Sequence, residues 1–266
     1  MQDILKKIEI WKREDTARRK EDVPLSILKM ISGYSGECIS LYDKLKDANE
    51  PCIITEFKRK SPSKGDINLK GNPVEICKSY ETAGATAISV LTDQEFFGAE
   101  TTDFSKVRAV VDLPLLRKDF ILEEYQVHET KAMGADVILL IAAMLSPKEV
   151  DMLAELARKL GMDVLLELHS ENEIDHISRH VNILGVNNRN LKNFDVDLKH
   201  SQDFAGKLPK NIPTIAESGL SGYQDVVNLY KSGFKGFLMG EYFMKSDNPG
   251  KKCRQLIDKI TRRDGA

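Results

Sequence analysis

The strongest constraint on the fold of this chain is a repeat that begins at Pro51. Short runs rich in β-branched and other apolar residues alternate there with longer amphipathic segments, and the spacing of about 26 residues leaves room for one strand, one helix and two short loops. The eight runs are CIITEF (52–57), TAISVL (86–91), PLLRK (114–118), DVILLIA (136–142), DVLLEL (163–168), NILGVN (182–187), IPTIAE (212–217) and KGFLMG (235–240). This alternation predicts a parallel sheet with right-handed crossovers.

Eight such units close into a (β/α)8 TIM barrel, which is the α/β fold that we predict. The alternative, an open doubly wound sheet, usually has fewer strands and often carries G-x-G-x-x-G after the first one, a motif that this chain lacks. Helix ends support the division, because Ser146 and Ser221 stand at expected N-caps and a glycine follows four predicted helices. Those helices are 74–84, 123–134, 146–161 and 221–233, and the glycines are Gly84, Gly134, Gly161 and Gly233.

The residues before the repeat have a different pattern. An amphipathic helix among charged residues is indicated by apolar positions at Ile4, Leu5, Ile8 and Trp11. One or two further short helical pieces are indicated before Pro51, and no strand-like run occurs there. We therefore predict a single barrel domain over residues 1–266, in which 1–48 form an N-terminal helical extension.

The charge balance argues against broad polyanionic partners. Lys and Arg number 39 and Asp and Glu 41, a net charge of −2, whereas a surface for nucleic acid or anionic membrane needs a strong basic excess. The four cysteines are far apart and form no C-x-x-C pair, which disfavours a zinc ribbon or dithiol site, and free thiols suit a reducing compartment. The N-terminus lacks the apolar core of a signal peptide, and no apolar stretch approaches the ~20 residues of a membrane span. We expect a cytoplasmic protein with no nucleic-acid and no membrane partner.

Charged residues gather where the predicted strands end, and the active sites of such barrels lie at the C-terminal ends of the strands. Side chains alternate along a strand, so the apolar parity of each run faces the helices and the other parity faces the barrel axis. The inward positions at this end carry carboxylates, cations and one amide, at Glu56, Glu167, Glu217, Lys58, Lys118, Arg189 and Asn187. One charged residue after a strand is usually a solvated loop residue. Several that converge at one mouth must shift one another's pKa values, as acid–base catalysis requires.

Two glycine-containing turns indicate a phosphate site. Ser218-Gly219 follows the seventh run and Gly240 the eighth, and phosphate sites of such barrels are often built from these two loops and a short extra helix, here 241–245. The alternative is that both glycines are only turn residues. Large apolar side chains near the ends of the second to fourth runs are either core or the floor of a pocket for a planar ring; they are Phe96, Phe97, Phe120 and Leu139.

Five segments resemble the indole-3-glycerol phosphate synthase family. They are TEFKRKSPSKG (55–65), PLLRKDFILEEYQVHETKAMGADVILLI (114–141), LLELHS (165–170), LGVNNRNL (184–191) and AESGL (216–220), and the likeness covers essentially the whole chain. The resemblance implies ring closure, decarboxylation and dehydration of 1-(o-carboxyphenylamino)-1-deoxyribulose 5-phosphate to indole-3-glycerol phosphate, in tryptophan biosynthesis. It further implies a barrel whose N-terminal extension folds over the site, a small phosphorylated substrate as the partner, and no metal or organic cofactor.

The resemblance also implies residue roles by motif position. Lys118 resembles the general acid that protonates the ribulose carbonyl, Glu167 the base of the later dehydration, and Lys58 the lysine that binds the substrate carboxylate and is a second candidate acid. Glu56 and Asn187 resemble groups that orient the others. Substrate contacts are expected from Arg189, Ser61, Phe97, Phe120, Leu139, Glu217 and Ser218, and phosphate contacts from Gly219, Gly240 and Glu241.

Three points stay open within this resemblance. A lysine acts as the acid only if its pKa is drawn toward 7, which nearby cations and burial favour and nearby carboxylates oppose. The segment FFGAE (96–100) lacks an expected second glycine and a serine, at Ala99 and Glu100. Glu241 stands where relatives have a small hydroxyl residue, and we expect its carboxylate to turn away from the phosphate, leaving only its N–H to face it.

Two other functions also stay open. Another phosphate-binding barrel enzyme is one: an aldolase often has its Schiff-base lysine on the sixth strand, where this chain has Asn187, and an isomerase would want a Cys or Asp pair where Glu56 and Glu167 stand. A non-catalytic ligand-binding barrel is the other, although such a protein need not keep the charged ring. We expect a monomer or a weak homodimer.

Overall fold

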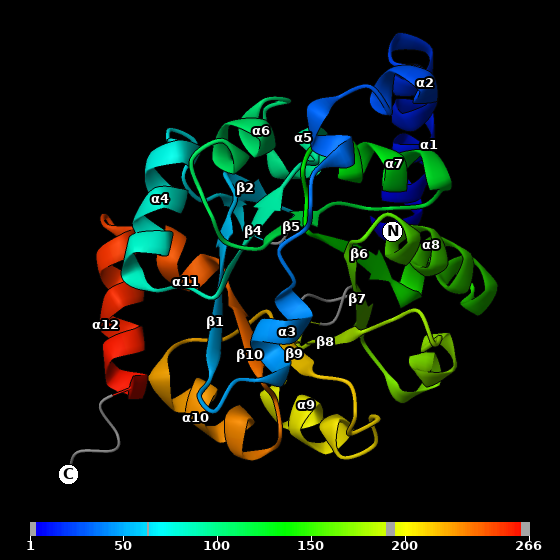
Figure 1. The fold of residues 1–266 in the computed structure, drawn as a ribbon. Helices are drawn as coiled ribbons and strands as arrows, with labels where there is room; N and C mark the ends of the chain where they lie inside the picture. Colours follow the sequence, from blue (N-terminus) through cyan, green and yellow to red (C-terminus); the bar gives the residue numbers. More distant parts are fainter. Residues whose placement is uncertain (1–3, 63, 190–194, 262–266) are drawn as a thin grey trace.

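The structure, a computed structural model, describes residues 4–62, 64–189 and 195–261. In this part of the chain eight parallel strands form a closed barrel, in chain order around the ring, so that the first also pairs with the last (Figure 1). They are β1 (Cys52–Phe57), β4 (Ala87–Leu91), β5 (Leu115–Lys118), β6 (Val137–Ile141), β7 (Asp163–Leu168), β8 (Ile183–Asn187), β9 (Thr214–Glu217) and β10 (Gly236–Met239). The predicted (β/α)8 barrel is confirmed, and each strand lies within its predicted run.

Helices follow the strands and surround the barrel. They are α4 (Pro73–Ala83), α5 (Gln94–Phe97), α6 (Asp103–Arg108), α7 (Glu124–Ala132), α8 (Pro147–Lys159), α9 (Leu198–Ala205), α10 (Tyr223–Lys231), α11 (Glu241–Met244) and α12 (Pro249–Thr261), with the 3₁₀ turns η2 (Ala142–Met144) and η3 (Glu171–His176). The loop after β1 also contains a short antiparallel pair that the sequence did not indicate, β2 (Lys60–Ser61) and β3 (Gly65–Asp66).

The predicted helix ends are confirmed except for one. All four predicted terminal glycines have positive φ. Ser146 caps α8, and Glu149 completes a reciprocal capping box with it. Ser221 does not cap α10, which begins at Tyr223 after Gly222; both the N–H and the hydroxyl of Ser221 donate to Asp225 instead, at 2.7 and 2.6 Å. The predicted N-cap at Ser221 was therefore one residue too early.

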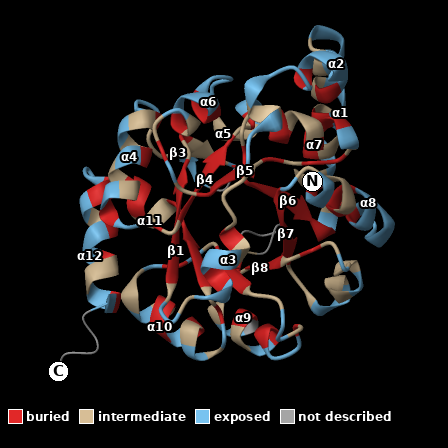
Figure 2. Ribbon diagram, viewed as in Figure 1, coloured by how far each residue is buried: buried red, intermediate tan, exposed pale blue. Residues whose placement is uncertain are grey.

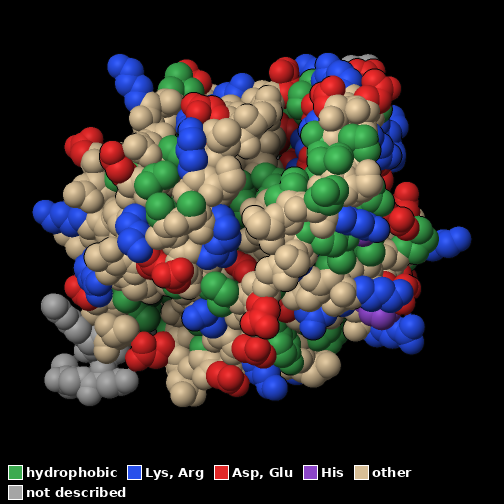
Figure 3. Space-filling view, turned by 45° about the horizontal axis from the view of Figure 1, so that its top comes forward, with side chains coloured by type: hydrophobic (Ala, Val, Ile, Leu, Met, Phe, Trp, Pro, Cys, Tyr) green, Lys and Arg blue, Asp and Glu red, His purple; other side chains and the backbone are tan. Residues whose placement is uncertain are grey.

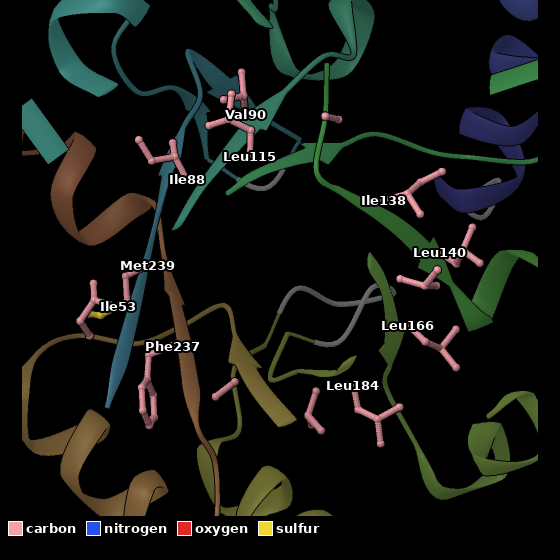
Figure 4. Close-up of a cluster of buried hydrophobic side chains, with 14 of the residues drawn as sticks. Ile53, Ile88, Val90, Leu115, Ile138, Leu140, Leu166, Leu184, Phe237 and Met239 are labelled. Carbon is pink, nitrogen blue, oxygen red and sulfur yellow. The ribbon is translucent and has the colours of Figure 1, made fainter. Parts of the chain in front are cut away.

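Strand side chains form an apolar layer on each face of the barrel wall. The outer layer packs against the helices and includes Ile53, Ile88, Ile138, Leu166 and Phe237 (Figure 4). The inner layer fills the barrel and includes Ile54, Leu116, Leu139, Leu165 and Ile215. Both follow from strand alternation. The strands are consequently buried while the outer helix faces are exposed (Figure 2).

The N-terminal extension reaches both ends of the barrel. α1 (Ile4–Asp22) lies beside α7, as do α2 (Leu25–Leu28) and η1 (Ser32–Ser35), whereas α3 (Leu41–Lys46) lies across the middle of the ring in Figure 1. Leu41 and Leu45 of α3 join the inner apolar layer, and Ser40 binds Asp163 at the start of β7. The expectation that residues 1–48 as a whole cover the site is thus corrected, because α3 uses its leucines to fill the base of the barrel.

The surface matches the balanced composition. On the face shown in Figure 3, Lys and Arg side chains are interspersed with Asp and Glu. None of the helices formed by the described residues is long and apolar enough to cross a membrane.

Candidate active site

One cavity at the C-terminal mouth of the barrel, with a volume of about 660 Å³, brings the predicted site residues together. Its wall includes Glu56, Lys58, Ser61, Phe97, Lys118, Phe120, Leu139, Glu167, Asn187, Arg189, Glu217, Ser218, Gly219, Gly240 and Glu241. These residues meet because inward-facing positions at the ends of parallel strands converge when the sheet closes. Other wall residues, among them Ile8 of α1, Lys64 and Lys245, were not assigned to the site from the sequence.

Lys118, the last residue of β5, lies among carboxylates. Its Nζ is 3.0 Å from Glu167 Oε2 and 3.7 Å from Glu217 Oε2. Burial by itself lowers the pKa of Lys118, but attraction from the surrounding carboxylates, first that of Glu167, holds this pKa above its usual value. The sequence left open whether burial or the nearby carboxylates decide the pKa of Lys118. The carboxylates outweigh burial, so Lys118 is an ammonium ion at neutral pH.

Glu167, on β7, is held by three neighbours. Its Oε2 pairs with Lys118, while its Oε1 accepts a hydrogen bond from Asn187 Nδ2 at 2.9 Å and lies 3.2 Å from His169 Nε2. Burial by itself raises the pKa of Glu167, but the ammonium and the other two neighbours hold that pKa well below its usual range. The sequence analysis did not identify His169 as a site residue, although its side chain lies on the same face of the strand as that of Glu167 in LLELHS.

Glu217, at the end of β9, is in a different state. Burial, followed by repulsion from Glu167, raises the pKa of Glu217 to about 8, so this side chain is mainly protonated at neutral pH. Among the described residues its Oε1 has no hydrogen-bond partner. The same oxygen packs against Gly185 of β8, where any Cβ atom would collide with it.

Glu56 and Lys58 form a second charged pair at the end of β1. Lys58 Nζ donates to Glu56 Oε1 at 2.6 Å, and Ser89 of β4 donates to the other carboxylate oxygen at 3.4 Å. Glu56 also lies against Gly240, where a Cβ atom would collide with the carboxylate. The glycine at 240 is therefore needed for the approach of Glu56, a reason that the sequence did not suggest.

The turn after β9 has an unusual backbone. Ser218 and Gly219 both have positive φ, 64° and 73°, and Ser218 is the only non-glycine residue in the described ranges with this conformation. Asn188 holds the turn, since its Nδ2 donates to the carbonyls of Glu217 and Ser218 at 2.7 and 2.9 Å. Left-handed backbone at a non-glycine residue persists only where its surroundings enforce it, and such positions cluster at ligand-binding sites.

Glu241 lines the cavity and pairs with two cations. Its Oε1 lies 2.6 Å from Lys245 Nζ and its Oε2 3.6 Å from Arg189 Nη2. Burial raises the pKa of Glu241, but the hydrogen bond from Lys245 and the nearby cations hold it below its usual value. These two ion pairs hold the carboxylate, and its orientation relative to a bound phosphate stays a prediction.

Apolar side chains also form part of the cavity wall. The rings of Phe97 and Phe120 are 6.1 Å apart, and Leu139 of the inner layer lies on the same wall. Phe96, also expected at the pocket floor, is not part of the wall and instead packs edge-to-face on Trp11 of α1 at 5.9 Å. Ala99 and Glu100 do not line the cavity either, so the departures at these positions do not alter its described wall.

The described residues do not suggest a metal centre. Among them, no group of three or more His, Cys, Asp or Glu side chains is arranged to hold a metal ion. The donor atoms at the mouth instead pair with one another as ammonium and carboxylate groups, which suits proton transfer.

A family model and curated relatives point to the same protein family. A family model described as indole-3-glycerol phosphate synthase matches residues 5–256. The chain is 42% identical over 260 residues to indole-3-glycerol phosphate synthase of Bacteroides thetaiotaomicron, covering 98% of this chain and 100% of the relative. The protein of the same name from Burkholderia multivorans is 37% identical over 260 residues, which cover 97% and 100% of the two chains.

Solved structures with a similar fold are more distant in sequence. Thiamine phosphate pyrophosphorylase from Pyrococcus furiosus has a TM-score of 0.61 at 18% identity and covers 84% of this chain and 98% of its own. Tryptophan synthase subunit alpha from Legionella pneumophila has a TM-score of 0.60 at 14% identity, with coverage of 83% and 95%. At these identities the likeness shows the fold alone.

Proposed function

The chain belongs to the indole-3-glycerol phosphate synthase family, and on that premise we propose how its own residues carry out the reaction. The enzyme closes the ring of 1-(o-carboxyphenylamino)-1-deoxyribulose 5-phosphate, with loss of CO2 and water, to form indole-3-glycerol phosphate in tryptophan biosynthesis. It is therefore a carboxy-lyase. One observation carries the proposed roles: Lys58 and Lys118, each against a carboxylate, line the same cavity as the Phe97 and Phe120 rings and the Ser218-Gly219 turn.

The chemistry of the cavity wall suggests how the substrate lies. The aromatic ring of the substrate packs on the Phe97–Phe120 wall, and its carboxylate faces the Lys58 ammonium. The phosphate lies at Ser218-Gly219 and Gly240, where glycine lets backbone N–H groups approach an anion closely, and the cations Lys64 and Lys245 line the same cavity. This pose puts the ribulose carbonyl close to Lys118, at the centre of the mouth.

Lys118 is the general acid of ring closure in this proposal. When a ring carbon attacks the carbonyl carbon, the carbonyl oxygen becomes an alkoxide and takes a proton from Lys118. The raised pKa of Lys118 does not prevent this transfer, because an alkoxide is far more basic than an amine, and it keeps the donor fully protonated beforehand. The protonated Glu217, 3.7 Å away, can return a proton to Lys118.

In the later dehydration the new hydroxyl group leaves as water with a proton from Lys58, the second candidate acid, and the proton on the adjacent ring carbon goes to the base, Glu167. Its pKa is low while Lys118 carries a positive charge, so loss of the Lys118 proton raises the basicity of Glu167. The first proton transfer thus prepares the acceptor for the second. Asn187 and His169 orient Glu167, and Glu56 orients Lys58. Loss of CO2 restores aromaticity, so it needs mainly a fixed geometry from the protein.

We also propose what the enzyme needs as cofactor, where it acts and in which oligomeric state. These steps are proton transfers between placed groups, so we propose that no metal or organic cofactor takes part. The four free cysteines suit a cytoplasmic enzyme. We also propose a monomer or a weak homodimer without nucleic-acid or membrane partners, which sedimentation velocity would test.

The roles are tested by turnover of the carboxyphenylamino substrate by purified enzyme in EDTA, followed by indole fluorescence. Lys118→Met should lower kcat by at least ~10²-fold, since a positioned general acid contributes that much. Lys148→Met, at an exposed lysine of α8, is the matched control and should leave the rate unchanged. No turnover by the unmodified enzyme would overturn the activity, and an unchanged kcat in Lys118→Met would move the acid role to Lys58.

A further inference from the structure

Lys12 of α1 is a buried cation that the proposed reaction does not use. Its side chain is 2% exposed, and its Nζ lies 2.6 Å from Asp93 Oδ2 and 2.7 Å from Asp119 Oδ1. Asp93 follows β4 and Asp119 follows β5, so one ammonium group joins α1 to two strand-end loops. A lysine is rarely buried to this degree unless its charge is compensated, as it is here.

Both aspartates position residues of the cavity wall. The other oxygen of Asp93 accepts the N–H of Phe96 at 2.7 Å and so begins α5, the helix that ends with Phe97. Asp119 directly follows Lys118, and its Oδ1 accepts the N–H of Phe120 at 2.8 Å. The two loops that Lys12 joins therefore carry the aromatic wall and the general acid.

α1 itself forms part of the same cavity. Ile4, Leu5 and Ile8 line it, and Ile8 lies one helical turn before Lys12, so these side chains share a face of the helix. The Lys12 ammonium is thus the polar end of the face that α1 presents to the mouth.

The charges of Asp93 and Asp119 are both compensated only when the Lys12 ammonium is present. Burial raises the pKa of Asp93. Burial would also raise the pKa of Asp119, but attraction from Lys12 and then from Arg117 holds that pKa well below its usual range. Without Lys12, two buried carboxylates would face each other with only the Asp119 side still bound to a cation, Arg117 at 3.0 Å.

We propose that Lys12 is a positioning residue for this reaction, which holds α1 and the loops after β4 and β5 in the one arrangement that closes the ring pocket around the substrate. The proposal rests on the proposed function for the identity of the substrate. Lys12 acts through Asp93 and Asp119 and does not itself reach the reacting atoms. Its loss should therefore weaken binding of the aromatic part of the substrate and leave the phosphate loops intact.

Two variants test the positioning role of Lys12. Lys12→Met removes the ammonium and keeps most of the side-chain volume, but repulsion between the aspartates could unfold it. In the double variant Lys12→Met/Asp93→Asn the repulsion is removed, and the amide oxygen of the substituted side chain can still accept the Phe96 N–H, so only the link to α1 is lost. Arg108→Met is the matched control, because it breaks a 2.7 Å ion pair with Asp136 at the base of the barrel, where Asp136 keeps two backbone donors.

Trp11, the only tryptophan of the chain, reports on α1 without any need for activity. It contacts Phe96, and its ring lies 5.0 Å from the Lys12 ammonium. Its emission is measured in the ligand-free protein, where neither substrate nor product adds fluorescence. Inorganic phosphate, as a competitive inhibitor, probes the phosphate loops separately.

In the double variant we expect a red-shifted Trp11 emission, an unchanged inhibition constant for inorganic phosphate and a melting temperature close to that of the unmodified enzyme. The value of kcat/KM should fall by about 10²-fold, the effect of a misplacement of about 1 Å, mainly through KM. Arg108→Met should lose stability but keep its KM and emission. An unchanged KM and emission in the double variant, or an equal loss of phosphate inhibition, would overturn the proposal. Absence of turnover by the unmodified enzyme would instead overturn the proposed function and leave the emission to decide the role of Lys12.

Discussion

Glu217 and Glu167 lie close together at the mouth, but their surroundings shift their pKa values in opposite directions. Glu217 is buried to the same degree as Glu167, yet Glu167 has the closer contact with Lys118, at 3.0 against 3.7 Å, as well as the hydrogen bond from Asn187 and the 3.2 Å contact with His169. Two carboxylates that share one ammonium cannot both ionise freely, so the less favoured one keeps its proton. The site therefore stores a proton beside Lys118, the proposed general acid.

This proton makes the stability of the fold depend on pH. The folded-state pKa of Glu217 is about 8, above its ordinary value of 4.5, so between these limits the folded chain holds a proton that the unfolded chain has lost. Stability contributed by Glu217 is thus full below pH 4.5 and is lost as the pH rises through about 8. In Glu217→Gln, which cannot titrate, the melting temperature should fall less over this range than in the unmodified enzyme.

The measurement is a series of thermal melts from pH 5 to pH 9. Glu14→Gln, at an exposed position of α1, should give a curve parallel to that of the unmodified enzyme. Parallel curves for Glu217→Gln as well would show that Glu217 is ionised throughout and cannot supply a proton to Lys118.

At the scale of secondary-structure elements, the two ends of the barrel have separate tasks. The mouth carries the charged side chains of the cavity, whereas the base is filled by α3, whose Leu41 and Leu45 are fully buried. Gly236 at the start of β10 makes room for this helix, since a Cβ atom there would press on Leu45. The apolar surface that α3 buries thus lies at the end of the barrel opposite the candidate site.

Leu45→Ala tests this separation. The variant loses buried apolar surface and leaves a cavity, so the free energy of unfolding should fall by about 2–5 kcal/mol, measured by urea denaturation. At 25 °C, where the variant stays folded, its kcat and KM should be unchanged. Met152→Ala, at a half-exposed position of α8, is the control and should change the free energy of unfolding by less than about 1 kcal/mol. A raised KM in Leu45→Ala would mean that the base and the mouth are coupled.

At the scale of the whole molecule, the extension is joined to the barrel at both ends. α3 shares the inner core, and α1 is held by the buried Lys12 cluster, while β1 and β10 close the ring through the register that pairs Cys52 with Gly236. Loss of α3 would expose the inner apolar layer, and loss of α1 would leave Asp93 and Asp119 without the Lys12 ammonium. We therefore propose that residues 1–266 behave as one cooperative domain.

Unfolding in urea tests this cooperativity. Trp11 emission follows the extension and far-ultraviolet circular dichroism follows the helices of the barrel, so the two transitions should have the same midpoint and slope. A Trp11 transition at lower urea would show that α1 separates before the barrel unfolds, as intermediates of large chains often do.

The sequence predicted the barrel and the residues at its mouth for local reasons. Strand alternation assigned Glu56 and Lys118 to the inner face from their immediate neighbours alone. It could not assign Lys12, because this lysine looks like any other charged residue of an amphipathic helix until Asp93 and Asp119 are brought to it. His169 carried a signal, its parity with Glu167, whereas Asn188 carried none, since its partners are carbonyl groups of another strand end.

What the sequence determined by itself is the order of elements, the closed barrel and the gathering of the charged residues at one end of it, because periodicity, helix caps and strand parity depend on residues close together in the chain. The tertiary structure alone decided that α3 fills the base, that Glu241 pairs with Arg189 and Lys245, and that Glu217 keeps its proton while Lys118 keeps its charge. These outcomes depend on burial and on distances of a few ångströms between groups far apart in sequence, and electrostatic interactions change steeply with both.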